Sequence, residues 1–228
     1  MALPPSTSTV CCPSGSTPAR AREEIAMTFI NTIDPADAPA EVQAMYRQLQ
    51  GRLDYLPNYA PVFSHRPRVM SAWAALQDTI REELSDREYS LITLAAARAM
   101  GSTYCALAHT RKLCRKHFSE EELLAILQEP SSSSLTAAER AMMALADKVV
   151  RSPSTVRQED VDALREQGCS DARVFDVVAA AAARCFFARV PDALGVRADP
   201  ALGQMNRVLR ELLVVGRPID GGANTVPG

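Results

Sequence analysis

A repeated helix-start motif constrains the fold of this 228-residue chain more than any other feature. The pattern Ser/Thr-x-x-Glu occurs at residues 85–88, 119–122 and 136–139. In this capping box the hydroxyl accepts a hydrogen bond from a backbone N–H in the first helical turn, and the Glu carboxylate accepts one from the capping residue. Sustained alternation of apolar and polar residues, the pattern of strands, is almost absent. The sequence therefore predicts an all-α protein.

Apolar residues at helical spacing extend this prediction along the chain. We expect helices over residues 37–52, 67–83, 85–99, 102–116, 119–127, 136–150, 158–167, 170–193 and 200–213. In the second of these, one stripe contains Val69, Trp73, Leu76 and Ile80. No linker is long enough to separate two domains. We therefore expect one bundle of about nine helices.

The ends of the chain set the expected domain boundaries. Residues 1–27 are rich in Pro, Ser and Thr and predict a flexible leader; residues 1–26 are alternatively an over-extended gene start. The helical domain is predicted to span residues 28–214. The Gly- and Pro-rich residues 215–228 are predicted to form a flexible tail.

Composition excludes several classes of protein. The chain has 25 Lys and Arg against 27 Asp and Glu, so its net charge of -2 offers no basic surface for nucleic acid. The most apolar run, residues 174–187, is interrupted by Asp176 and Arg184 and is too short to span a membrane. Six cysteines without regular spacing favour reduced thiols and a cytoplasmic protein. The sequence contains no Cys-x-x-Cys or His-x-x-x-His pair, so it predicts no metal site.

One polar row is a candidate for chemistry. Ser102, Cys105 and His109 are three and four residues apart, so they share one helix face. With Ser102 as the N-cap, Cys105 occupies the third helical position, where the helix dipole and a nearby imidazole lower a thiol pKa from its usual value of about 8.5. A lowering of roughly two units would make the thiolate the majority form near neutral pH, which is what a reactive cysteine requires. The alternative is a packing cysteine and an ordinary histidine.

The segment LSDREYSLITLAAARAMGSTYCALAH, residues 84–109, resembles the core of the carboxymuconolactone decarboxylase and AhpD-like alkylhydroperoxidase superfamily. The resemblance covers about residues 40–196, and its core motif lies at residues 84–117. Residues 135–140, 160–171 and 194–196 resemble the peroxidase-related branch of the family. It implies an AhpD-like helical bundle. Redox members of this family carry an acidic residue on one helix and Cys-x-x-Cys-x-x-x-His on the next.

The family motif transfers unevenly. Cys105 matches the second motif cysteine and His109 the histidine, but Ser102 replaces the first cysteine. A serine cannot resolve a sulfenic acid, so a peroxidase cycle needs an external thiol, a second subunit or another cysteine of the chain. Cys114 lies half a turn around the same helix, which makes Cys185 the better internal candidate.

The acidic relay residue is also displaced. The family register places it at Ser90, and Glu88 lies two positions earlier, about 200° around the helix. We favour the capping role of Glu88 over a relay to His109. The cations Arg111, Lys112 and Arg115 near His117 are interpreted as a response to the helix C-terminal dipole.

The resemblance implies an oxidoreductase with peroxiredoxin-type activity that reduces an alkyl hydroperoxide without a cofactor. Cys105 would be the peroxidatic thiolate, His109 its proton acceptor and Ser102 a hydrogen-bond donor, with an external thiol as reductant. The family also implies a homo-oligomer, either a dimer, a trimer or a hexamer. Two alternatives stay open: a decarboxylase-like enzyme that uses His109 as acid and base, and a non-catalytic helical oligomer.

Overall fold

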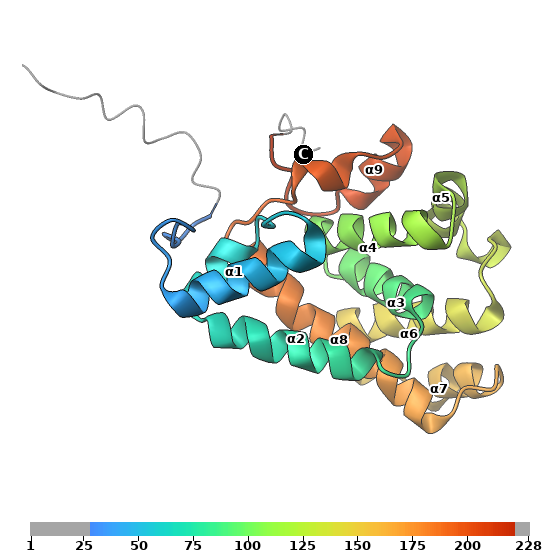
Figure 1. Ribbon diagram of the computed structural model, residues 1–228. Coiled ribbons are helices and arrows are strands. Elements are labelled where there is room, and N and C mark those ends of the chain that lie inside the picture. The colour runs from blue at the N-terminus through green and yellow to red at the C-terminus, as the bar shows by residue number, and fades with distance from the viewer. Residues whose placement is uncertain (1–27, 222–228) are drawn as a thin grey trace, which may run out of the picture.

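The computed structural model describes residues 28–221, and within them it contains nine α-helices joined by short connections (Figure 1). This confirms the predicted all-α bundle. The α-helices are α1 Ala40–Leu53, α2 Pro67–Arg81, α3 Asp86–Ala99, α4 Thr103–Lys116, α5 Glu120–Gln128, α6 Ala137–Arg151, α7 Gln158–Arg165, α8 Asp171–Ala193 and α9 Arg207–Leu213. Short 3₁₀ helices lie at Ala60–His65, Pro130–Ser132, Pro153–Thr155 and Pro200–Gly203. The predicted leader, residues 1–27, lies outside the described residues.

The three predicted capping boxes all form. At the starts of α3, α5 and α6 the capping hydroxyl accepts a hydrogen bond from the third helical N–H, and the Glu three residues later accepts one from the capping residue. These bonds satisfy backbone donors that have no partner within the helix. The first residue of each helix is thus set by local sequence.

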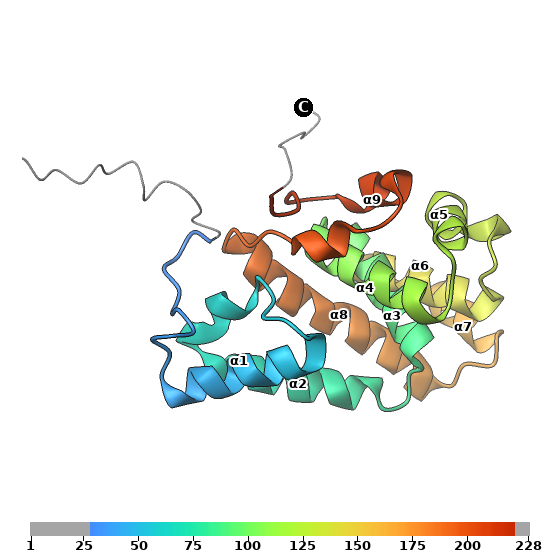
Figure 2. The ribbon, with the colours of Figure 1, turned by 45° about the horizontal axis from the view of Figure 1, so that its top comes forward.

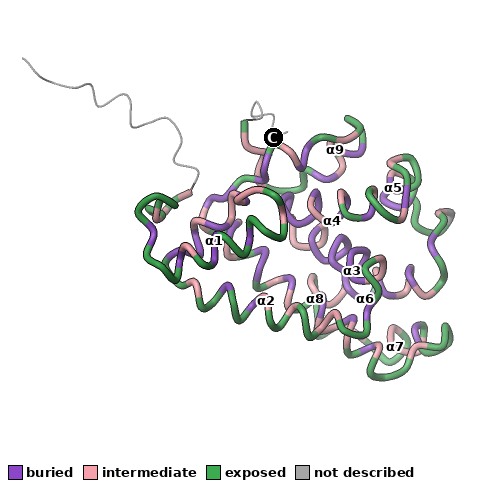
Figure 3. The backbone as a smooth tube through the Cα atoms, viewed as in Figure 1, coloured by how far each residue is buried: buried purple, intermediate pink, exposed green. Residues whose placement is uncertain are grey.

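Helix α3 lies at the centre of the bundle and packs against α4, α6 and α8. Every residue from 89 to 97 is buried, which Figure 3 shows as a purple helix among mixed neighbours. Leu91 and Leu94 belong to one hydrophobic cluster, whereas Ile92 and Ala96 belong to the other. Small alanine side chains allow the neighbouring backbones to approach closely. Figure 2 shows α1 and α2 on one side of α8, with α3 and α4 on its other side.

The predicted apolar stripe of α2 is correct at Trp73 and Ile80, which pack against the core, and wrong at Val69 and Leu76. Val69 and Leu76 are 40% and 51% exposed, whereas Met70 and Trp73 are buried. The helix packs against α1 and α8, and contact with these two partners selects the face that includes Met70 and Trp73. The helix period was predicted correctly, but its rotation depends on helices distant in the sequence.

The C-terminal region departs from the prediction in two ways. The single helix expected over residues 200–213 is interrupted, because the Asn206 side chain accepts hydrogen bonds from Val208 and Leu209 and starts α9. The tail expected from residue 215 is held in part: Gly216 N donates to Thr103 Oγ1 at 2.9 Å, and Asp220 N donates to the Ala198 carbonyl at 2.9 Å. Local sequence could not reveal these partners. We call residues 214–221 the C-terminal strap.

No helix within residues 28–221 combines the length and apolar character needed to cross a lipid bilayer.

Candidate active site

A cavity of about 620 Å³ is lined by residues of α1, α2, α4 and α8 and of the segment after Pro200. This volume lies in the range of sites for small organic molecules. Its buried wall is apolar and aromatic, and consists mainly of Leu49, Met70, Trp73, Tyr104, Phe187 and Leu202. One face of α4 supplies a continuous strip of the wall: Tyr104, Cys105, Ala108, His109, Arg111, Lys112 and Arg115. The strip is continuous because residues three and four apart share a helix face.

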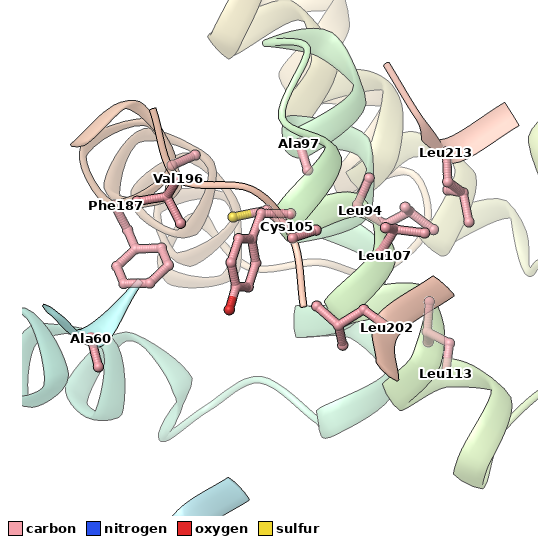
Figure 4. Close-up of a cluster of buried hydrophobic side chains, with 14 of the residues drawn as sticks. Ala60, Leu94, Ala97, Cys105, Leu107, Leu113, Phe187, Val196, Leu202 and Leu213 are labelled. Atoms are coloured by element: carbon pink, nitrogen blue, oxygen red, sulfur yellow. The ribbon is translucent and has the colours of Figure 1, made fainter. Parts of the chain in front are cut away.

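Cys105 is the sulfur in this wall. Ser102 is the N-cap of α4, so Cys105 stands at the third helical position, as predicted. The residue is only 3% exposed, and its sulfur points toward the side where Phe187 lies and away from Leu107 (Figure 4). The predicted lowering of the thiol pKa is wrong, because burial raises the pKa of Cys105. Arg184 and Ser102 act in the opposite direction and favour the thiolate.

Arg184 is the site residue that sequence reasoning missed. It is 3% exposed on α8, donates to Tyr89 Oη at 2.8 Å, and lies over the rings of Trp73 and Phe187 at 5.3 and 5.4 Å. No carboxylate forms an ion pair with it among residues 28–221. Its sequence signal was a charged residue inside the most apolar run of the chain. A buried cation in such surroundings favours an anion beside it, and Cys105 is the ionisable neighbour in the cavity wall.

His109 lines the same cavity but is not hydrogen-bonded to Cys105 in the described part of the chain. Its ring is buried, and its Nδ1 has no hydrogen-bond partner there. Burial, together with the charges of Lys112, Arg184 and Arg81, lowers the pKa of His109 well below the usual range. The imidazole is therefore neutral at pH 7, and its surroundings disfavour the protonated form.

Ser102 and Glu88 both lie outside the cavity lining. Ser102 is fully buried and does not line the cavity, so the predicted donor can act on the Cys105 sulfur but does not face a bound peroxide. Glu88 Oε2 accepts from Ser85 N at 2.9 Å, and the carboxylate forms an ion pair with Arg173 at 2.6 Å. It does not line the cavity. The relay from Glu88 to His109 is therefore absent, because the capping box and Arg173 hold the carboxylate elsewhere.

A phenol and carboxylate network borders the cavity beside Cys105. Buried Asp199 accepts hydrogen bonds from Tyr104 Oη, from Tyr55 Oη at 3.3 Å and from Asn58 N at 2.9 Å. Burial and the Asp199 carboxylate raise the pKa of Tyr55 to about 12. Both phenols thus stay protonated, and Tyr104 holds the segment before Pro200 against α4 while Tyr55 holds it against the loop after α1.

Some basic residues near the end of α4 face the cavity as well as lying near the helix C-terminus. Arg111, Lys112 and Arg115 line the cavity, which the interpretation as helix-end charges did not anticipate. Lys116 instead pairs with Asp86 at 3.0 Å outside it.

No second thiol within residues 28–221 lines the cavity with Cys105. Cys185 Sγ donates to the Ala181 carbonyl at 3.5 Å and borders a separate shallow depression with Phe186 and Arg189. Cys114 packs against the core from another face of α4. The internal resolving role predicted for Cys185 thus lacks the necessary proximity. In the same part of the chain, no three His, Cys, Asp or Glu side chains are grouped to hold a metal ion.

Comparison with known proteins agrees with this architecture. Residues 67–148 match the model of the carboxymuconolactone decarboxylase family. No curated protein sequence matches the chain. A peroxidase-related protein with an AhpD core from Ralstonia eutropha JMP134 is 22% identical, with a TM-score of 0.68 over 85% of this chain and 100% of that one.

Two further solved structures share the fold. A peroxidase-related protein from Silicibacter sp. TM1040 is 19% identical, with a TM-score of 0.70 over 79% of this chain and 96% of its own. The debrominase Bmp8 in complex with 2,3,4-tribromopyrrole is 21% identical, with a TM-score of 0.66 over 83% of this chain and 98% of its own. At these identities the structures establish the fold alone. The similarity to the carboxymuconolactone decarboxylase family thus extends over α2 to α6, and the solved structures share the helical fold over most of the chain.

Proposed function

We propose that this chain is an AhpD-like oxidoreductase that reduces an organic hydroperoxide with the Cys105 sulfur. The observation that carries the proposal is the placement of Cys105 in the cavity wall beside Arg184, a buried cation without a carboxylate partner in the described chain. This cation favours the thiolate, the reactive form of a cysteine, at the place where a small molecule can bind. The debrominase relative with its bound 2,3,4-tribromopyrrole supports a small organic occupant.

The proposed chemical step requires only the hydroperoxide and the Cys105 thiol. The Cys105 sulfur attacks an oxygen of the hydroperoxide, the S–O bond forms and the O–O bond breaks. Sulfur loses two electrons and becomes a sulfenic acid, while the peroxide is reduced to an alcohol. The proton lost by the thiol ends on the departing alkoxide, so the products are the sulfenic acid and a neutral alcohol.

Turnover requires an external thiol, because no second cysteine of the described chain lines the cavity. One external thiol attacks the sulfenic acid, which releases water and forms a mixed disulfide with Cys105. A second external thiol then displaces Cys105, which leaves as a thiol, and the reductant leaves as its disulfide.

Trapping of the sulfenic acid tests the proposal. After treatment of the reduced protein with cumene hydroperoxide and then dimedone, mass spectrometry should locate the adduct at Cys105. Cys105→Ser should abolish hydroperoxide consumption, whereas the control Cys185→Ser should retain it, since Cys185 borders a different depression. Because burial raises the pKa of the thiol, labelling should continue to accelerate as the pH rises through the ordinary thiol range. An unlabelled Cys105 with unchanged consumption in Cys105→Ser would contradict the proposal.

A second candidate is a decarboxylase-like activity in which His109 acts as acid and base. The unpartnered Nδ1 of this buried, neutral imidazole favours it. In that case Cys105→Ala should retain turnover of a lactone acid and His109→Ala should lose it. If the two substitutions alter nothing but the melting temperature, the non-catalytic helical oligomer stands. The homo-oligomer and the cytoplasmic location stay predictions.

A further inference from the structure

The charges around the cavity are strongly one-sided. Asp54 supplies the single carboxylate of the lining. Six basic side chains line the cavity: Arg52, Arg81, Arg111, Lys112, Arg115 and Arg184. The whole chain nevertheless has a net charge of -2. The excess of positive charge is therefore a local property of this cavity.

Two of the cations are neutralised by carboxylates, because Arg52 pairs with Asp78 at 3.4 Å and Arg81 pairs with Asp86 at 2.6 Å. The others form no ion pair within the described chain. Arg184 is buried beside Cys105, whereas Lys112 and Arg115 are exposed, so they stand at the solvent end of the cavity.

The basic side chains of α4 repel one another. Arg111 and Arg115 are four residues apart, and like charges at this spacing repel each other. Lys112 is exposed as a whole residue, but desolvation of its ammonium by the surrounding side chains and the charges of Arg184 and Arg81 lower its pKa to about 8, so the protein disfavours the cation. A bound anion would relieve both costs.

The interior of the cavity has the opposite character. Trp73 and Phe187 are stacked with their ring centroids 5.3 Å apart, and Met70 and Leu202 extend the apolar wall. Cys105 lies in this buried part. A ligand that satisfies both regions has one negatively charged end and an apolar body.

We infer that the cavity binds a small amphiphilic carboxylate. Its carboxylate lies at Lys112 and Arg115, and its apolar body extends from there toward Cys105. This deepens the proposed function, since it makes the substrate of the Cys105 site a carboxylate-bearing hydroperoxide. Arg111 contributes charge as well, but its Nη1 is also bonded to the Ala201 carbonyl at 3.0 Å. Lys112 and Arg115 have no such structural bond in the described chain, so they are the residues to change.

Binding can be measured without catalysis, because Trp73 is the single tryptophan of the chain and lies in the cavity wall. Its fluorescence should report titration with 4-phenylbutanoate and with the neutral amide 4-phenylbutanamide in the Cys105→Ser protein. We expect the carboxylate to bind at least about tenfold more tightly than the amide, the effect of one charged hydrogen bond. Added salt should weaken binding of the carboxylate alone.

The double variant Lys112→Gln/Arg115→Gln should lose most of the preference for the carboxylate and leave the affinity for the amide unchanged. The control Arg68→Gln/Arg189→Gln removes the same charge from exposed residues outside the cavity and should keep the preference. Two results would overturn the inference: equal affinity of the Cys105→Ser protein for carboxylate and amide, or an undiminished preference for the carboxylate in the Lys112→Gln/Arg115→Gln variant.

The outcome is separable from that of the proposed function. Selective carboxylate binding without a dimedone adduct at Cys105 would contradict the peroxidase alone. Peroxidase activity at Cys105 without selective carboxylate binding would contradict the inferred substrate class and leave the proposed function intact.

Discussion

Arg184 and Cys105 form the smallest unit on which the chemistry depends. Burial raises the pKa of the Cys105 thiol, and the guanidinium of Arg184 partly reverses that effect. Arg184→Met should therefore raise the thiol pKa by about one unit, the lower end of the effect of a close opposite charge. Iodoacetamide labelling of Cys105 at pH 8, followed by mass spectrometry, should slow accordingly.

The conservative variant Arg184→Lys separates charge from packing. It should restore part of the labelling rate, because an ammonium supplies the charge without the stacking on Trp73 and Phe187. Labelling of the half-exposed Cys185 serves as an internal control in the same sample and should not change. Equal Cys105 labelling rates in all three proteins would show that Arg184 has no influence on the thiol.

At the level of elements, Glu139 joins two helices. It completes the capping box of α6 and pairs with Arg87 of α3 at 2.5 Å. Burial alone would raise the pKa of this carboxyl, but the bonds from Arg87 and Thr136 hold it below the usual range. The folded state thus binds this proton more weakly than the unfolded chain. The stabilisation is complete above the ordinary pKa of 4.5 and is lost as the pH falls through the lower folded value.

Glu139→Gln should lower the free energy of unfolding at pH 7 by about 2–3 kcal/mol, because a charged hydrogen bond is lost and a cation is left unpaired. It should also flatten the acid limb of the stability profile. Urea unfolding at several pH values measures both effects. The matched control is Glu122→Gln, which alters the capping box of α5 but no ion pair. An equal loss in both variants would assign the whole effect of Glu139 to capping.

At the scale of the whole molecule, the C-terminal strap closes the fold over the start of α4. Gly216 donates to Thr103, and a Cβ added to Gly216 would lie 1.9 Å from the Gly101 carbonyl oxygen. Gly216→Ala should therefore displace the strap and cost about 1–3 kcal/mol, as overpacking does. The melting temperature should fall.

Gly51 provides the control with the opposite sign. It lies inside α1, and a Cβ there would meet no atom within 4 Å. Gly51→Ala should stabilise the protein by about 0.5–1 kcal/mol, because alanine loses less backbone entropy in a helix. A Gly216→Ala protein that melts at the wild-type temperature would show that the strap contributes nothing to stability.

The sequence by itself determined the features that depend on neighbours along the chain. Capping boxes fixed the starts of α3, α5 and α6, since their donors and acceptors are within three residues of each other. The helical period placed Cys105 and His109 on one face of α4 for the same reason.

The surroundings of these residues depend instead on the packing of the whole fold. The rotation of α2, the burial that raises the Cys105 pKa, the approach of Arg184 and the anchoring of the strap all join segments far apart in the chain. Each depends on how helices pack. Because electrostatic and desolvation energies vary steeply with distance and burial, residue types and spacing along one helix could not supply them.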